Sequence, residues 1–211
     1  EEKILIICLE SKNQDEITNA VKDVLKKCIL TRGVKVDELP TFDIEYLFLN
    51  IRAKSIGEDI KMTVTCPDDG TTQVPVTVYV DEIEVIKPKD HKTDIVLDDK
   101  LTLRMKYPSL SQFVENNFEV NDDPKTIVSK TFKVVADCMD TVFTQEDAWE
   151  AKDYTPDERL KFIEQLNSKQ YKEVEKFFAT MPKLSHTIEV INPNTKQKNS
   201  VVLEGLADFF G

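Results

Sequence analysis

The 211-residue sequence is poor in the residues on which several kinds of functional site depend. It contains five glycines, four cysteines, two histidines and one tryptophan. The glycines are widely separated, so they form no loop of clustered backbone N–H groups that would hold a phosphate. The longest uninterrupted apolar run, Ile4–Leu9, is far shorter than the ~20 residues that cross a bilayer. We therefore expect neither a nucleotide-phosphate loop nor a membrane span.

Positive charge is scarce as well. The sequence has 28 Lys and Arg residues against 39 Asp and Glu residues, which gives a formal charge of −11. Such a balance repels phosphate backbones and anionic membrane surfaces. We therefore expect no nucleic-acid partner. The start at Glu1–Lys3 has no Met and no basic flank before a long apolar core, so it is not a secretory signal, and what lies upstream of Glu1 is left open.

The scarcity of histidine limits catalysis. A Ser–His or Cys–His pair would need His91 or His186. His91 lies in the charged run Lys87–Lys92, which we expect to be an exposed loop. His186 occupies the same alternate positions as Leu184 and Ile188, as a core or interface histidine would. No carboxylate pair stands out among the acidic residues. The sequence thus predicts no catalytic residue, no cofactor and no enzyme.

The cysteines give one candidate metal site, and it is incomplete. Cys8, Cys28, Cys66 and Cys138 are far apart and form no Cys-x-x-Cys pair, which favours a reducing compartment and buried, unbridged thiols. Cys66 opens the turn 66–70, at the position where zinc-ribbon hairpins place Cys-x-x-Cys, but the residue three places on is an aspartate. A turn without metal is the better interpretation. A degenerate zinc-ribbon adaptor that retains a metal through Cys66 and distant ligands is the alternative.

Hydrophobic periodicity divides the chain into helices and hairpins. Apolar residues at helical spacing predict a helix that ends near Gly33 and another between Pro40 and Gly57. Strict alternation on both sides of Asp68–Gly70 predicts a β-hairpin over 60–80, and further alternation predicts strands at 94–98 and 101–107.

The second half also places helices before a hairpin, and two unrelated hairpins explain this better than an internal duplication. An apolar stripe from Ile127 to Met139 predicts a helix that starts at Pro124, and Thr155 and Glu158 have the spacing of a capping box. Ser168 is the predicted cap of one more helix, which closes before Met181–Pro182. Alternation around the turn 192–195 predicts a second hairpin, which closes the chain.

These elements predict an α+β fold in which helical segments alternate with antiparallel β-hairpins, the hairpin near 60–80 being a degenerate zinc-ribbon-like one. We divide the chain into a helical segment at 1–58, a hairpin and strands at 59–108, a helical segment at 109–183 and a hairpin with a tail at 184–211. These segments form one compact unit or two tightly packed lobes.

Large apolar side chains gather in two places. One lies around residues 42–49 and the other near the end of the chain. Aromatic residues are enriched in protein interfaces, although burial in the core is their usual fate. The candidate protein-contact residues are Phe42, Tyr46, Phe48, Phe209 and Phe210.

Several stretches resemble the baseplate hub protein family of T-even-type phages. The resemblance is carried by residues 39–49 and 51–58, and it extends to Glu1–Leu5, Tyr107–Ser109, Phe178–Leu184 and Gly205–Phe210. Some members of that family carry a Cys pair at the first hairpin and at the final one. This sequence lacks that pattern, so the resemblance transfers no metal to it.

The resemblance implies a hub component or a factor that assembles the hub, acting by protein–protein contact. Its expected partners are other phage baseplate or hub proteins, and a homo-oligomer is left open. The resemblance places the protein in the bacterial cytoplasm during assembly, with the tail baseplate of the virion as its alternative final location.

Overall fold

Two compact units make up the chain in the computed structural model, which describes residues 14–109, 112 and 124–210. The first unit combines residues 14–36, 42–86 and 182–210. The second combines residues 37–41 with the described residues between 87 and 181. The chain thus leaves the first unit after its first hairpin and returns to it for its last, so this unit is built from segments far apart in the sequence.

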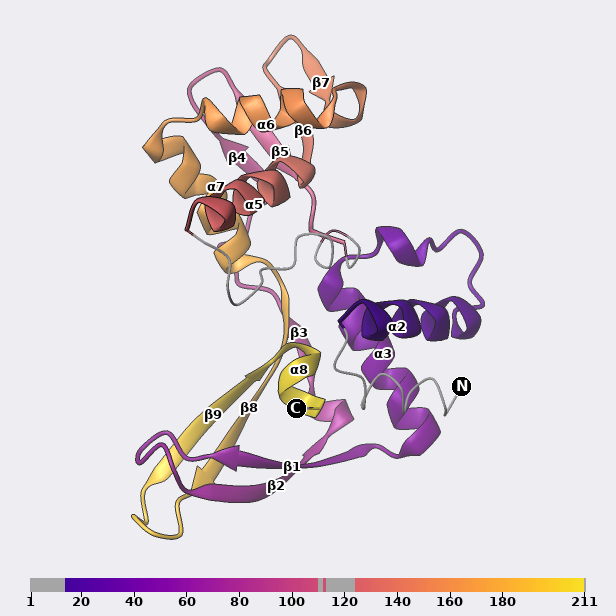
Figure 1. Cartoon of the computed structure of the whole chain (residues 1–211), viewed down its shortest axis with the longest axis vertical. Helices are drawn as coiled ribbons and strands as arrows, with labels where there is room; N and C mark the ends of the chain where they lie inside the picture. Colours follow the sequence, from indigo (N-terminus) through magenta and orange to yellow (C-terminus); the bar gives the residue numbers. More distant parts are fainter. Residues whose placement is uncertain (1–13, 110–111, 113–123, 211) are drawn as a thin grey trace. The chain divides into compact units, whose positions relative to one another are not determined.

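The first unit holds helices and two long antiparallel hairpins, which lie side by side in Figure 1. One hairpin is a two-stranded sheet of β1 and β2, and the other, β8 and β9, is joined by the short strand β3 in the order β3-β8-β9. The elements are α2 (Gln14–Cys28), α3 (Thr41–Ile56), β1 (Asp59–Thr65), β2 (Gln73–Tyr79), η2 (Val80–Glu82), β3 (Glu84–Ile86), β8 (Lys183–Ile191), β9 (Lys198–Glu204) and α8 (Gly205–Phe210). The short 3-10 helix η1 (Val36–Glu38) includes the last residue of the segment 14–36 and the first two of 37–41.

Alternating apolar residues of the two hairpins build the core of this unit. Ile60 and Val64 of β1 and Leu203 of β9 are buried in one cluster, to which α3 contributes Leu49 and α8 contributes Phe209. The intervening positions of β1 and β9 are exposed and, except for Val202 of β9, polar, because successive side chains of a strand point to opposite faces. The helices therefore complete a core that neither hairpin could enclose alone.

The second unit is a four-stranded antiparallel sheet with the order β4-β5-β6-β7, packed with helices. Leu103 of β5, Ile163 of α6 and Val174 of α7 are fully buried at its centre. The elements are β4 (Asp94–Val96), β5 (Thr102–Met105), α5 (Pro124–Asp137), β6 (Met139–Phe143), β7 (Ala148–Glu150), η3 (Ala151–Asp153), α6 (Pro156–Glu164) and α7 (Ser168–Thr180).

The α+β prediction is confirmed, together with several element boundaries. Pro124 is the first residue of α5, and the capping box of α6 forms as expected, with the Glu158 N–H donating to Thr155 Oγ1 and the Thr155 N–H donating to Glu158 Oε2 at 2.8 Å. The cap of α7 was predicted wrongly. It is Asn167, not Ser168, because the amide of Asn167 accepts N–H bonds from the first turn while Gln170 closes the box from the other side.

Three strands and a short helix were missing from the prediction. β3 falls between the predicted hairpin over 60–80 and the predicted strand at 94–98. The segment 109–183, expected to be helical, also contains β6 and β7. The helical stripe was extended to Met139, four residues after Val135, but α5 ends at Asp137 and Met139 opens β6. The final apolar tail forms α8.

Some predictions lie outside the described residues. They cover residues 1–13 of the predicted helical segment at 1–58, and residues 110–111 and 113–123 of the predicted helical segment at 109–183. Within the described ranges, no helix combines the length and apolar character that crossing a membrane requires.

Candidate functional site

The tips of the two long hairpins have nearly the same backbone. In the first tip, the Gly70 N–H donates to Cys66 O at 2.9 Å, and in the second the Lys196 N–H donates to Asn192 O at the same distance. Gly70 and Lys196 have φ angles of 65° and 64°, so each turn passes through the left-handed region at its fifth residue. A proline follows the first residue of both turns. The candidate metal turn at Cys66 therefore has a structural counterpart at Asn192.

Hydrogen bonds join the two tips through Asn192. Its side chain is fully buried, and its amide nitrogen donates to Asp68 Oδ1 at 2.8 Å and to Asp69 Oδ2 at 3.0 Å. Its amide oxygen accepts from the backbone N–H groups of Asn194 and Thr195. All four hydrogen-bonding positions of this amide are thus used, which is what a buried polar side chain requires.

The two carboxylates of the first tip are held by the same network. Asp69 accepts from the Thr72 hydroxyl, the Thr72 backbone N–H, the Asn192 amide and the Thr71 backbone N–H, and these bonds hold its pKa well below the usual range. Asp68 accepts from the Thr195 hydroxyl, which is the first cause of its own lowered pKa. The tips are therefore tied together by ionised carboxylates and amides.

The polar network leaves no ligand set for zinc. The positions that a zinc ribbon would fill with sulfur or imidazole hold Cys66, Asp69, Asn192 and Thr195. Asp69 and Asn192 bond to each other, and Thr195 donates to Asp68. Among the described residues, no group of three or more His, Cys, Asp or Glu side chains could hold a metal ion. A zinc site of the ribbon type does not fit these residues.

The described cysteines are unbridged. Cys66 and Cys138 are fully buried and Cys28 is half-buried, while Cys8 lies outside the described residues. Burial raises the pKa of the Cys138 thiol to about 12, and burial followed by the charges of Asp68 and Asp69 raises the pKa of the Cys66 thiol. Both thiols therefore stay protonated and unreactive at neutral pH.

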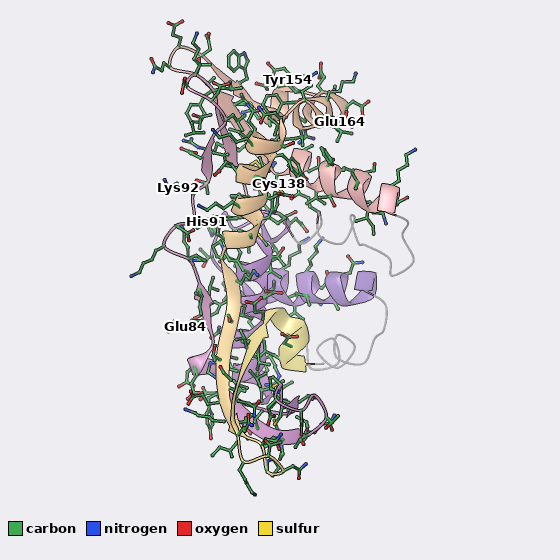
Figure 2. All side chains as sticks on the ribbon, turned by 90° about the vertical axis from the view of Figure 1, so that its left-hand side faces the viewer. Glu84, His91, Lys92, Cys138, Tyr154 and Glu164 are labelled. Carbon is green, nitrogen blue, oxygen red and sulfur yellow. The ribbon has the colours of Figure 1, made fainter. Side chains whose placement is uncertain are left out.

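The histidines serve the fold in different ways. The loop that carries His91, labelled in Figure 2, was expected to be exposed, but the His91 side chain is buried. Its Nδ1 lies 3.0 Å from Thr180 Oγ1 and its Nε2 lies 2.9 Å from the Tyr107 hydroxyl, so both ring nitrogens have partners. His186 is partly buried, and its Nδ1 lies 3.0 Å from Glu82 O. His91 is thus buried by its packing against Phe177 and by its hydrogen bonds, although its neighbours in the sequence are charged.

The family comparison adds what the geometry cannot supply. The model of a family described as T4 bacteriophage base plate protein matches residues 1–211 of this chain. The chain belongs to this family. No curated protein and no solved structure matches it. The resemblance noted in the sequence is thereby confirmed at the level of a T4-type phage baseplate protein.

The candidate contact residues of this baseplate protein differ widely in exposure. Phe48 and Phe209 are 2% and 1% exposed, whereas Phe42 is half-buried and Tyr46 is 40% exposed. Phe210 ends α8, and its side chain lies outside the described part of the structure. A contact role for the five residues stays a prediction, and exposure favours Tyr46. The sequence reasoning missed the pairing of the hairpin tips, for which the repeated x-Pro turn was the available signal.

Proposed function

We propose that this baseplate protein is a component of the baseplate hub, or a factor that assembles the hub, and that it acts through protein–protein contact without catalysis. The match of the family model along the entire chain carries this proposal. We also propose that it meets its partners in the bacterial cytoplasm during assembly, and that these partners are other hub or baseplate proteins.

The chemistry of the described residues supports a non-catalytic role. Both nitrogens of His91 are engaged, and the Asp68 and Asp69 carboxylates are used to hold the hairpin tips together. The buried Cys66 and Cys138 thiols are held in their protonated form. These particular groups are therefore committed to the fold.

Co-purification tests the proposal. The complete gene is co-expressed with the hub genes of its phage, the protein is captured by an affinity tag, and the mass of the complex is measured by light scattering. We expect a stable complex with at least one hub protein. A lone protein that captures none of them contradicts the hub role, and the mass of the protein alone determines whether it forms a homo-oligomer.

Analysis of purified phage particles separates a component from an assembly factor. A hub component is present in the finished particle in a fixed ratio to the other baseplate proteins. An assembly factor is required for particle formation but absent from the particle. Quantitative mass spectrometry of particles and of infected-cell extracts distinguishes these two forms of the proposal.

A further inference from the structure

Among the strands that the structure describes, the sheet of the second unit ends in an open edge. β7 is the last strand in the order β4-β5-β6-β7, and Ala148, Trp149 and Glu150 are all exposed. The Thr144 N–H donates to Asp147 O at 2.8 Å and closes the hairpin. Hydrogen-bonded pairs alternate along an antiparallel ladder, so Trp149 bonds to Val142 while the backbone groups of Ala148 and Glu150 point away from the sheet. β7 therefore presents donors and acceptors to another strand.

A pocket of about 430 Å³ lies next to this edge. Trp149 is opposite Val142, and Val142 is opposite the fully buried Leu103, so all three side chains share the core face of the sheet. Trp149 is 39% exposed, and Tyr154, labelled in Figure 2, is exposed to a similar degree. The lining is mainly apolar and includes Val142, Trp149, Ala151, Tyr154 and Phe162.

The edge and the pocket fit one type of occupant. A strand added beside β7 would bond to Ala148 and Glu150, and its residue opposite Trp149 would point to the core face of the sheet. An apolar side chain at that position would enter the pocket. Pocket and edge together therefore fit an extended segment. Every second side chain of this segment would face the core side of the sheet, and the one opposite Trp149 would be apolar.

The negative charge around β7 favours an occupant with positive charge. Residues 140–158 carry seven carboxylates and one lysine, a formal charge of −6 out of −11 for the whole chain. Arg159, which follows, is paired with Asp137 at 3.3 Å, so including this pair adds no net charge. A second copy of the chain would bring the same negative charge to the edge, whereas a basic segment would be attracted.

We propose that β7 binds an extended basic segment of another baseplate protein, which adds a strand to the sheet and places an apolar side chain in the pocket beside Trp149. The proposal rests on the proposed function for the source of the segment. The edge, the pocket and the charge are independent of which baseplate protein supplies it.

The test uses overlapping peptides of about 15 residues that cover the other baseplate proteins of the phage, a length that spans such an edge. Binding to the full chain is followed by the fluorescence of Trp149, because the chain has no other tryptophan. We expect the bound peptides to be basic, to shift the emission to shorter wavelength as Trp149 becomes buried, and to bind more weakly at ~0.5 M than at ~0.05 M salt.

A matched pair of proline variants tests the strand contact. Ala148→Pro removes an N–H that points away from the sheet at β7, and we expect it to weaken peptide binding roughly tenfold or more. Val96→Pro is the control at the opposite edge. The bonds of Leu97 to Leu101 and of Met105 to Thr93 place Val96 at the equivalent outward position on β4, where it is 67% exposed. We expect Val96→Pro to leave binding unchanged.

A charge variant keeps the test valid if a proline variant fails to fold. Glu146→Lys changes an exposed turn residue outside the strand ladder, and we expect it to weaken the binding of basic peptides severalfold at low salt. Circular dichroism and thermal melting check the fold of every variant. Binding that survives both Ala148→Pro and Glu146→Lys overturns the proposal.

Other outcomes also decide it. The proposal is wrong if no peptide binds, if the bound peptides are acidic, or if light scattering shows a dimer that Ala148→Pro dissociates, since a second copy would then occupy the edge. Hub proteins that co-purify equally with wild type and Ala148→Pro would leave the hub role standing and remove the β7 contact. If the only peptides that bind come from baseplate proteins outside the hub, the β7 contact would stand and the hub role would be contradicted.

Discussion

Two acidic hairpin ends of this baseplate protein use their charge in opposite ways. At the tips of β1–β2 and β8–β9, Asp68 and Asp69 accept hydrogen bonds from the turn of the facing hairpin. Their negative charge is therefore compensated within the protein. At the β6–β7 end, Glu146 lies on an exposed turn beside an open strand edge. The comparison teaches that the hydrogen-bond partners of a carboxylate, rather than acidity alone, distinguish a structural cluster from a candidate binding surface.

The largest effect should come from removing the central amide of the hairpin tips. Asn192→Ala leaves the Asp68 and Asp69 carboxylates and the N–H groups of the turn without their buried partner, and we expect the free energy of unfolding to fall by ~2–4 kcal/mol. Urea denaturation measures this loss of unfolding free energy. Asn50→Ala is the matched control, because the Asn50 amide makes an exposed bond to Tyr46 O and should cost below ~1 kcal/mol.

The equivalent residue at each turn should give changes of opposite sign. Gly70→Ala forces a side chain into the left-handed region with no atom within 4 Å of the new Cβ, so the backbone alone should cost ~1 kcal/mol. Lys196→Gly relieves the same conformation and should stabilise the protein by up to ~1 kcal/mol. Urea denaturation measures both changes in unfolding free energy. If both variants are stabilised or both are destabilised, the two turns are not equivalent.

Acid should weaken the hairpin tips selectively. The folded-state pKa of Asp69 is depressed by its hydrogen bonds, so the ionised group stabilises the fold above the unfolded pKa of ~3.9, and this stability is lost as pH falls through the folded pKa. Asp69→Asn should therefore flatten the dependence of the urea midpoint on pH below ~4. Glu84→Gln, at an exposed position of β3, is the control. An unchanged slope in Asp69→Asn would show that the tip carboxylates are not linked to folding.

Metal removal should have the smallest effect. Because hydrogen bonds occupy the positions of a zinc ribbon, a chelator should shift the melting temperature by less than ~1 °C. Differential scanning calorimetry with and without chelator measures the shift. Stoichiometric zinc in the purified protein, lost together with several degrees of stability, would restore the zinc-ribbon alternative.

Elements with strong local signals were predicted well. The Thr155 and Glu158 pair formed its capping box, and alternation on each side of a Pro-containing turn identified both long hairpins. The short strands β6 and β7 were missed because Met139 continues the spacing of α5, and because their pairing with β5 depends on residues distant in sequence. The buried state of His91 was missed for a similar reason, since Thr180 and Tyr107 are not its sequence neighbours.

The sequence by itself determined the helices, the hairpins, the negative charge and the baseplate family, because periodicity, capping and turn residues act over a few positions. Only the tertiary structure decided that Asn192 reaches Asp68 across 124 positions and that Trp149 borders a pocket next to an open strand edge. These relations depend on how distant strands pack. No local pattern encodes which buried amide satisfies which carboxylate, since that choice is made when the hairpins come together.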